Sequence, residues 1–504
     1  MTDDKQQRKL SRRELLSLIG TAGGTVLTGW YLSQNQPSRQ EPPTEERPTS
    51  VEPSNPPQFR GPPDGTESIA DHGGTVGVDT PEAAEENVAA IHRASTAADT
   101  STVYLPPGKW YVGKRDEPEF LNPGKAGAEL GAAGLGFVGE GPDLTFLVFQ
   151  KDTLEQGGGN EISYVGGTDH GDVVWRDLTY DGNYQNMAFD SGTRQWGIDI
   201  EGDTTANFTL QNFRLLNIQA LGLTASGSSD FRLTVDQSTF RNIGIGRVNQ
   251  ADGSALGHAL GPTVPAGRRL TVTNSRFELI SGNVIDFSRS DGFGSALIQN
   301  CFATGIGDTF IKEKGMQEVH LSNVFYQAHT PELESAMNQG AIEQERHGRG
   351  FLKQISGPGN GTTYVLENVE ARNMLRRAVN LRNGKHWRLR GGRNGPIRIR
   401  NVNMNGSDES YVWRESTDPQ SYFEFDIGTM ITDGVQGLVF DCPSSRGVVD
   451  TLYQQHTSGI GSTGRIEIGS QHQRAAPMEP NVPSRNAVGI NPLPVSDRRQ
   501  LRTK

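Results

Sequence analysis

The sequence predicts an all-β fold in which short parallel strands stack as the coils of a solenoid. Three observations point to it. Short segments of alternating apolar residues follow one another after about residue 100, long helical patterns are nearly absent there, and strand-bearing segments repeat with a short period. Because the repeats contain no helix, each coil is expected to bury its inward side chains against the next coil, about 4.8 Å away.

Composition divides the 504 residues into four parts. Residues 1–32 carry Arg12 and Arg13 directly before an apolar run, which resembles a twin-arginine export signal and predicts an extracellular or cell-surface protein. Residues 33–66 are rich in Pro, Ser and Glu and are expected to form a disordered linker, as are residues 475–504 at the end. Residues 67–474 are left as one folded domain.

The apolar run near the N-terminus has two possible fates. No clear cleavage site follows it, so the sequence leaves open whether the signal is removed or retained as a membrane anchor. No later apolar run is long enough to span a bilayer, so any membrane contact is expected only through this segment.

The folded domain begins with a predicted helix at "TPEAAEENVAAIHRASTAA". Thr80 is a suitable N-cap, Pro81 fits the first helical position, and Glu82 and Glu85 favour the positive end of the helix dipole. The stretch "TVYLPPGKWYVG" follows and predicts a strand, a Pro-Gly turn and a second strand.

The repeats after this helix set the expected register. Gly282–Phe302 aligns with Gly305–Phe325 without a gap at a period of 23, which matches Asn300 with Asn323 and Arg289 with Lys312. Recurrent Asn at one turn predicts a ladder of side-chain amides that pair with backbone groups. An all-β sandwich or barrel, which also has short strands and frequent turns, is the rival fold.

Three segments carry a resemblance to a known family: "IADHGG", "NVAAIHRAS" and "VYLPPGKWYVG". Together they are similar to the N-terminal cap of right-handed parallel β-helix proteins of the pectate-lyase superfamily. The chain departs from that pattern before Ala89, where "EEN" stands in place of a pair of Asp. The resemblance implies a right-handed parallel β-helix with a short capping helix, and a groove along the coils for a long polysaccharide. It does not imply a particular reaction.

If the polysaccharide is a uronate polymer, a lyase needs positive charge to neutralise the sugar carboxylate and a base to take the adjacent proton. The stretch from Gly282 to Gly315 offers suitable groups, and we expect the catalytic residues among them. A solvated polar turn is the alternative interpretation. The candidates are Lys312, as the base, with Arg289, Asp308 and Asp286.

A glycoside hydrolase of the polygalacturonase type is the second enzymatic hypothesis. Asp286, Asp308 and His329 follow one another at 22 and 21 residues, and "GDTFIK" is faintly similar to the Gly-Asp-Asp stretch of that family. Thr309 stands where the second Asp belongs, and the gapless repeat matches it with Asp286. A one-residue offset would send Asp308 to the opposite face, so hydrolysis ranks below elimination. A non-catalytic glycan-binding or structural protein is the third possibility.

A local excess of positive charge stands out in a chain of formal net charge -11. Residues 372–400 hold nine arginines and one lysine without a carboxylate. In "HWRLR" and "IRIR" the arginines alternate with apolar residues, so they are expected to project outward in rows and contact an acidic polymer. Pairing with acidic residues of neighbouring coils is the alternative. With His329, the candidate substrate-binding residues are Arg388, Arg390, Arg398 and Arg400.

Cofactors and other partners receive little support from the sequence. The histidines show no paired metal-ligand spacing, so no dedicated metal site is expected, although calcium held by carboxylates would be an alternative source of positive charge. Export makes nucleic acid an unlikely main partner. The two cysteines, Cys301 and Cys442, are not a disulfide framework, and three sequons are weak evidence for a glycoprotein.

Overall fold

The computed structural model describes the chain between Arg60 and Arg474, with gaps. Met1–Gln58 forms one unit and Phe59–Lys504 a second, and all described residues belong to the second. The predicted signal and tail therefore lie outside the described residues, as does most of the predicted linker. The described ranges are 60–100, 102–113, 135–153, 159–164, 172–184, 194–202, 207–227, 232–244, 257–262, 268–287, 294–338, 350–354, 361–375, 377–381, 386–402, 411–415, 420–457 and 459–474.

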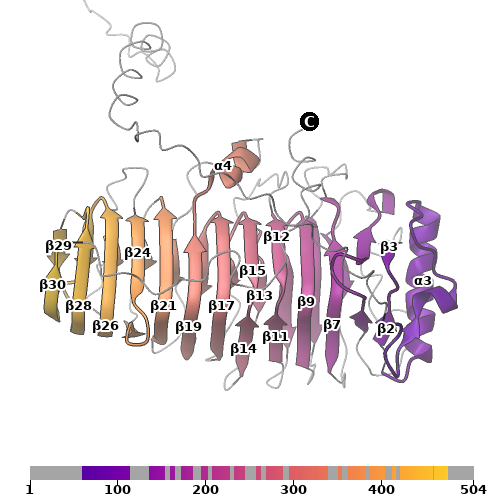
Figure 1. The fold of residues 1–504 in the computed structure, drawn as a ribbon, viewed down its shortest axis with the longest axis horizontal. Helices are drawn as coiled ribbons and strands as arrows, with labels where there is room; N and C mark the ends of the chain where they lie inside the picture. Colours follow the sequence, from indigo (N-terminus) through magenta and orange to yellow (C-terminus); the bar gives the residue numbers. More distant parts are fainter. Residues whose placement is uncertain are drawn as a thin grey trace, which may run out of the picture. The chain divides into compact units, whose positions relative to one another are not determined.

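The described strands lie in two sheets, and each strand is parallel to its neighbours (Figure 1). Sheet B, the smaller, has eleven strands that follow one another in chain order. These are β6 (Gly159–Tyr164), β8 (Arg194–Gly202), β10 (Leu223–Gly227), β13 (Leu260–Pro262), β16 (Ile285–Asp286), β18 (Thr309–Glu313), β20 (Gly350–Gln354), β22 (Val379–Asn380), β25 (Tyr411–Arg414), β27 (Leu438–Asp441) and β29 (Gly459–Ser462).

Sheet A contains the other nineteen strands and supplies two strand segments to most coils. It consists of β1 (Glu67–Ser68), β2 (Thr102–Tyr104), β3 (Gly108–Val112), β4 (Gly136–Val138), β5 (Thr145–Phe149), β7 (Val173–Asp181), β9 (Asn207–Ile218), β11 (Arg232–Asp236), β12 (Thr239–Ile243), β14 (Arg269–Thr273), β15 (Arg276–Ile280), β17 (Ser295–Ile306), β19 (Glu318–Gln327), β21 (Thr362–Met374), β23 (His386–Gly391), β24 (Ile397–Val402), β26 (Tyr422–Val435), β28 (Arg446–Gln455) and β30 (Arg465–His472).

This arrangement confirms the predicted parallel β-helix and excludes the rival sandwich or barrel. Long strands such as β9 and β17 pair with two successive shorter strands each, which shows that two segments of one coil run through a bend. The interior is filled by apolar side chains, including fully buried Trp175, Trp387 and Trp413. Solenoids of this kind bury their core between neighbouring coils rather than between distant elements.

The capping helix forms where the sequence predicts it. Helix α3 (Pro81–Ala97) begins after Thr80, whose side chain accepts a hydrogen bond from the backbone N–H of Ala83. Its buried face includes Val88 and Ile91 and covers the first strands. The other described helices are α4 (Pro331–Asn338) and the 3₁₀ turns η1 (Ile69–His72) and η2 (Lys151–Thr153). None of the described helices is long and apolar enough to cross a bilayer.

The predicted asparagine ladder exists, but its amides pair with one another and not with backbone groups. From one coil to the next the side-chain Nδ2 donates to the Oδ1 of the preceding residue, at 2.9–3.1 Å. Asp236 accepts the first hydrogen bond and the guanidinium of Arg398 donates the last, at 2.9 and 3.0 Å. Each Asn has a φ near +52°, a left-handed conformation that Asn tolerates better than most residues. The four are Asn274, Asn300, Asn323 and Asn368.

The predicted register holds in one sheet and fails in the other. Phe302 pairs with Phe325 in sheet A, at the predicted period of 23, and their rings stack 4.9 Å apart. In sheet B, however, Asp286 pairs with Lys312, a spacing of 26, so the predicted match of Asp286 with Thr309 is wrong. Ser295 follows Asp286 by nine positions, whereas its register partner Glu318 follows Lys312 by six, and this difference of three residues separates the two spacings.

Candidate functional site

The outer face of sheet B brings three charged side chains into one row. Asp286, Lys312 and Lys353 are register partners on β16, β18 and β20. The residues just before them on these strands, Ile285, Ile311 and Leu352, are fully buried in the core. Because strand side chains alternate between faces, the charged row lies on the outer face. The side chains of Lys312 and Lys353 are 20% and 12% exposed, and that of Asp286 only 4%.

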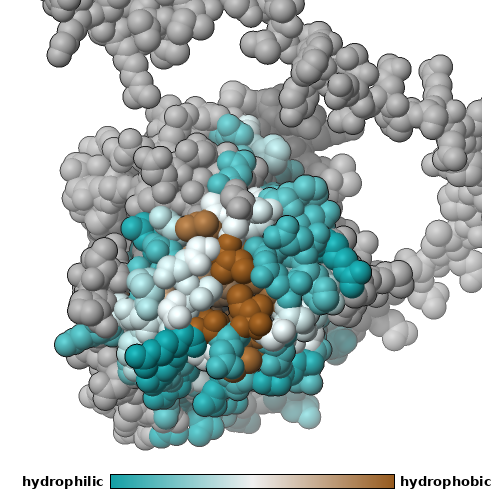
Figure 2. Space-filling view, turned by 90° about the vertical axis from the view of Figure 1, so that its left-hand side faces the viewer, coloured by the Kyte–Doolittle hydropathy of each residue, from teal (hydrophilic) through white to brown (hydrophobic). Residues whose placement is uncertain are grey.

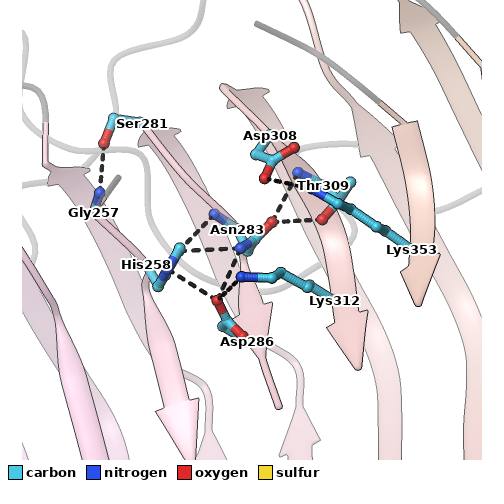
Figure 3. Close-up of polar contacts among 9 residues, drawn as sticks. All are labelled: Gly257, His258, Ser281, Asn283, Asp286, Asp308, Thr309, Lys312 and Lys353. Atoms are coloured by element: carbon cyan, nitrogen blue, oxygen red, sulfur yellow. Dashed lines mark hydrogen bonds and ion pairs between the residues drawn. The ribbon is translucent and has the colours of Figure 1, made fainter. Parts of the chain in front are cut away.

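Asp286 is held by three donors (Figure 3). Its Oδ2 lies 2.9 Å from Nε2 of His258, 3.1 Å from Nδ2 of Asn283 and 3.1 Å from Nζ of Lys312. A buried carboxylate costs free energy unless it is paired and hydrogen-bonded, and these three contacts meet that need. The position of the carboxylate is therefore fixed by side chains of its own coil and of the two neighbouring coils, one on each side.

The orientations of His258 and Asn283 follow from their other contacts. The backbone N–H of Asn283 donates to Nδ1 of His258 at 3.0 Å, so Nδ1 carries the lone pair and Nε2 carries the proton that faces Asp286. Oδ1 of Asn283 accepts from the backbone N–H and the hydroxyl of Thr309, at 3.2 and 2.5 Å. Both ring nitrogens of His258 thus contact the protein, and the ring serves to position Asp286.

A second aspartate–lysine pair lies beside the first (Figure 3). Nζ of Lys353 is 3.4 Å from Oδ2 of Asp308, whose side chain is 5% exposed. Oδ1 of Asp308 is buried and has no hydrogen-bond donor within the described part of the chain. Burial, assisted by the charge of Asp308, raises the pKa of Tyr326 well above its ordinary value. The two pairs place two carboxylates and two ammonium groups within one small set of side chains.

This geometry removes one argument against the hydrolase hypothesis. The 23-residue repeat placed Asp308 on the face opposite Asp286. In the structure Asp308 pairs with Lys353, the register neighbour of Lys312, so both aspartates belong to the same polar network. The other predicted neighbour of Lys312, Arg289, lies outside the described residues.

His329 lies elsewhere. It follows β19, its backbone N–H donates to the carbonyl of Asn373, and its Nε2 is 3.6 Å from Glu334 on α4. None of its hydrogen bonds or ion pairs among the described residues involves the aspartate–lysine pairs.

The predicted outward row of arginines forms on β23, where Arg388 and Arg390 are exposed beside buried Trp387 and Leu389, but it does not form on β24. Arg398 is fully buried, because its guanidinium ends the asparagine ladder, so its predicted exposure is wrong. Arg400 is 3.2 Å from Asp433, and Arg388 is 3.1 Å from Glu424.

Four of the described arginines of this stretch, Arg372, Arg388, Arg393 and Arg400, form ion pairs within the chain. Glu424 also accepts from Arg446, and these hydrogen bonds, that from Arg446 above all, lower the pKa of the Glu424 carboxyl. Arg393, in the same stretch, pairs with Asp426 and Asp450. Arg390 remains exposed on β23, without an ion pair among the described residues.

Sequence reasoning missed His258, Asn283 and Lys353. The strongest overlooked signal is the likeness of "TFIKE" at Thr309 to "GFLKQ" at Gly350, which the structure aligns as β18 and β20. The segment between these strands, which includes α4, separates the two copies by 41 residues and hides the period.

A calcium site does not fit the donors present. Among the described residues there is no group of three or more His, Cys, Asp or Glu side chains that could hold a metal ion. Asp286 and Asp308 already face ammonium groups, which occupy the positions where a cation would bind. Positive charge at this site therefore comes from lysine.

Comparison with known proteins gives only distant likenesses. No family model matches the chain. No curated protein matches it either. Among solved structures, the catalytic unit of a GH87 α-1,3-glucanase from Streptomyces thermodiastaticus strain HF3-3 matches with a TM-score of 0.40 and 12% identity, over 81% of this chain and 68% of that one.

Two further structures are similar at the same level. An alginate lyase from Paenibacillus sp. str. FPU-7 has a TM-score of 0.36 and 13% identity, over 60% of this chain and 92% of that one. The A-module of the Azotobacter vinelandii mannuronan C-5 epimerase AlgE6 has a TM-score of 0.32 and 12% identity, over 82% of this chain and 100% of that one. Likenesses this distant assign neither a reaction nor a substrate to the chain.

Proposed function

We propose that the outer face of sheet B from β13 to β20 binds an acidic polysaccharide and cleaves it by elimination at a uronate. The observation that carries the proposal is the pair Lys312 and Lys353, which are register neighbours on adjacent coils. Each is oriented by a nearly buried aspartate, Asp286 or Asp308. Neighbouring strands lie about 4.8 Å apart, so the ammonium groups form a short row that an extended chain of carboxylates can follow.

The lysines fit the neutralising role in this reaction. An ammonium group has three N–H donors, and Lys312 uses one of them to bind Asp286 while Lys353 uses one to bind Asp308. A sugar carboxylate that binds beside the two ammonium groups would be neutralised, which makes the adjacent C–H acidic. Lys312 forms an ion pair with Asp286, so we assign it to charge neutralisation rather than to the base.

Asp308 is the proposed base. Its Oδ1 has no hydrogen-bond donor among the described residues, so its lone pairs are available. Proton transfer from the sugar to this oxygen would be followed by cleavage of the bond between the neighbouring carbon and the glycosidic oxygen, which forms the double bond of the unsaturated product. The glycosidic oxygen leaves as a hydroxyl group after taking a proton from water. Because Oδ1 is buried, substrate binding must displace the groups that cover it.

The test uses alginate, pectate and a neutral glucan as substrates. Elimination produces both ultraviolet absorbance from the new double bond and new reducing ends, and only with the polyuronates. Lys312→Ala and Lys353→Ala are expected to raise KM and lower kcat/KM by at least tenfold. Asp308→Asn should lower kcat and keep substrate binding. Lys109→Ala, a change at an exposed side chain of β3, is the matched control and should have no effect.

Other outcomes reject parts of the proposal. Unchanged activity in Lys312→Ala and Lys353→Ala would show that this face is not the active site. Binding of a polyuronate without formation of either product would show that the protein binds the glycan and does not cleave it.

Hydrolysis is the second candidate function because Asp286 and Asp308 lie in one network. An inverting hydrolase needs one carboxyl group as acid and another as base, about 6.5–9.5 Å apart. New reducing ends without absorbance, lost in both Asp286→Asn and Asp308→Asn, would favour it over elimination.

A further inference from the structure

The two ends of the coil stack differ in whether a described helix covers them. At the N-terminal end, α3 covers the first coil with its apolar face. At the C-terminal end the last described strands are β29 and β30, and no described helix follows them (Figure 1). Figure 2 looks onto this end and shows apolar side chains in the middle of a polar rim. The inner residues of the last coil include Ile460, Ile466 and Ile468, of which the first and last pack at the margin of the core.

The backbone at this end is also incompletely paired within the described structure. β29 pairs only with β27, and β30 only with β28, so each has one free edge. Natural proteins usually protect such an edge with charged side chains, proline or a bulge. The four residues of β29, Gly-Ile-Gly-Ser, have none of these side chains, whereas β30 carries Arg465 and Glu467. An open strand edge beside partly buried apolar side chains favours association with another sheet edge.

We propose that this end binds the same end of a second copy of the chain, in a dimer with two-fold symmetry. The opposite end is covered by α3, so head-to-tail stacking of coils is blocked. Contact between two identical surfaces is two-fold symmetric, and β30 then meets β30 of the partner subunit in antiparallel orientation. The inference concerns assembly and is independent of the proposed reaction.

Charge complementarity on β30 favours this partner. Arg465 and Glu467 are exposed on the outer face of the strand, on either side of Ile466, which points inward. In an antiparallel pair centred on Ile466, Arg465 lies opposite Glu467 of the partner subunit, and the symmetry repeats this contact. Directly opposed side chains of opposite charge stabilise a strand pair, whereas like charges destabilise it. The same end of the coil stack therefore carries both the arginine and the glutamate that such a contact needs.

Charge reversal in the full chain tests the interface. Light scattering after size-exclusion chromatography is expected to give the mass of a dimer. Glu467→Arg places two pairs of arginines opposite each other and should raise the dimer dissociation constant at least tenfold. The double variant Arg465→Glu with Glu467→Arg restores opposite charges and should restore the dimer. Glu318→Arg, on the outer face of β19 in the same sheet, is the matched control and should remain dimeric.

Four results would overturn the proposal. The wild-type chain could be monomeric at every concentration. The dimer could be insensitive to Glu467→Arg, or the double variant could stay monomeric although its thermal unfolding matches that of the wild type. Protection from hydrogen exchange, in a monomer, of those β30 amides that do not bond to β28 would show that this end is covered by the chain itself, which also contradicts a dimer.

Discussion

Replacing Asn323 tests whether the asparagine ladder stabilises the solenoid. Its Nδ2 donates to Asn300 at 3.0 Å and its Oδ1 accepts from Asn368 at 2.9 Å, so Asn323→Ala removes two hydrogen bonds. Together these contribute about 1–3 kcal/mol. The backbone φ of +52° costs alanine about 1–2 kcal/mol more. We expect the free energy of unfolding to fall by about 2–5 kcal/mol.

Urea unfolding followed by tryptophan fluorescence measures this change, because four of the tryptophans report on the buried core. Asn323→Gly accepts the left-handed backbone and isolates the hydrogen-bond part of the loss. Asn401→Ala is the matched control, because Asn401 has a φ of +50° but lies at the exposed end of a short row and donates a single ladder bond, to Asn373. If Asn323→Ala and Asn401→Ala cost the same, or if Asn323→Ala changes stability by less than about 0.5 kcal/mol, the ladder does not stabilise the coils as argued.

Three other predictions concern single features. Burial raises the pKa of Glu313, against hydrogen bonds from Met316 and Trp387 among others, so protonation favours the folded state and the stability from this group is lost as pH rises above the ordinary value of 4.5. The unfolding free energy of the wild type, compared with Glu313→Gln across pH, should therefore fall with rising pH, and a parallel pair of curves would contradict this. Arg390→Ala should weaken retention on an immobilised polyanion in a salt-dependent way without lowering stability, and unchanged retention would argue against this surface as a contact. Replacing Arg12 and Arg13 by lysine should leave the precursor inside the cell, as cell fractionation would show, and normal export would refute the twin-arginine hypothesis.

The sequence predicted the fold because its determinants are local. Thr80 and Pro81 start the capping helix, and alternation together with the recurrent Asn residues places the strands and their bend. Each of these signals acts within a few residues or between adjacent coils. The hydrogen-bond partners of the asparagine side chains could not be predicted in the same way, because Asn at a turn can bond either backbone groups or another side-chain amide.

The candidate site was harder to predict because it depends on register in sheet B. A difference of three residues between two connections moves Lys312 from the position opposite Arg289 to the position opposite Asp286. The segment that contains α4 separates Lys353 from Lys312 by 41 residues, so no short repeat reveals that they are neighbours. The burial of Arg398 could not be predicted either. Strand alternation alone did not show that the last asparagine of the ladder accepts a hydrogen bond from this guanidinium.

The asparagine row also constrains how this solenoid can lengthen or shorten. All its amides point the same way, from a carboxylate at Asp236 to a guanidinium at Arg398, so each inner coil contributes one donor and one acceptor. Duplication or loss of a coil such as that of Asn300 would leave the sequence of bonds intact. Duplication of the coil of Asp236 or of Arg398 would set two acceptors or two donors against each other, so changes in coil number are expected between these two residues.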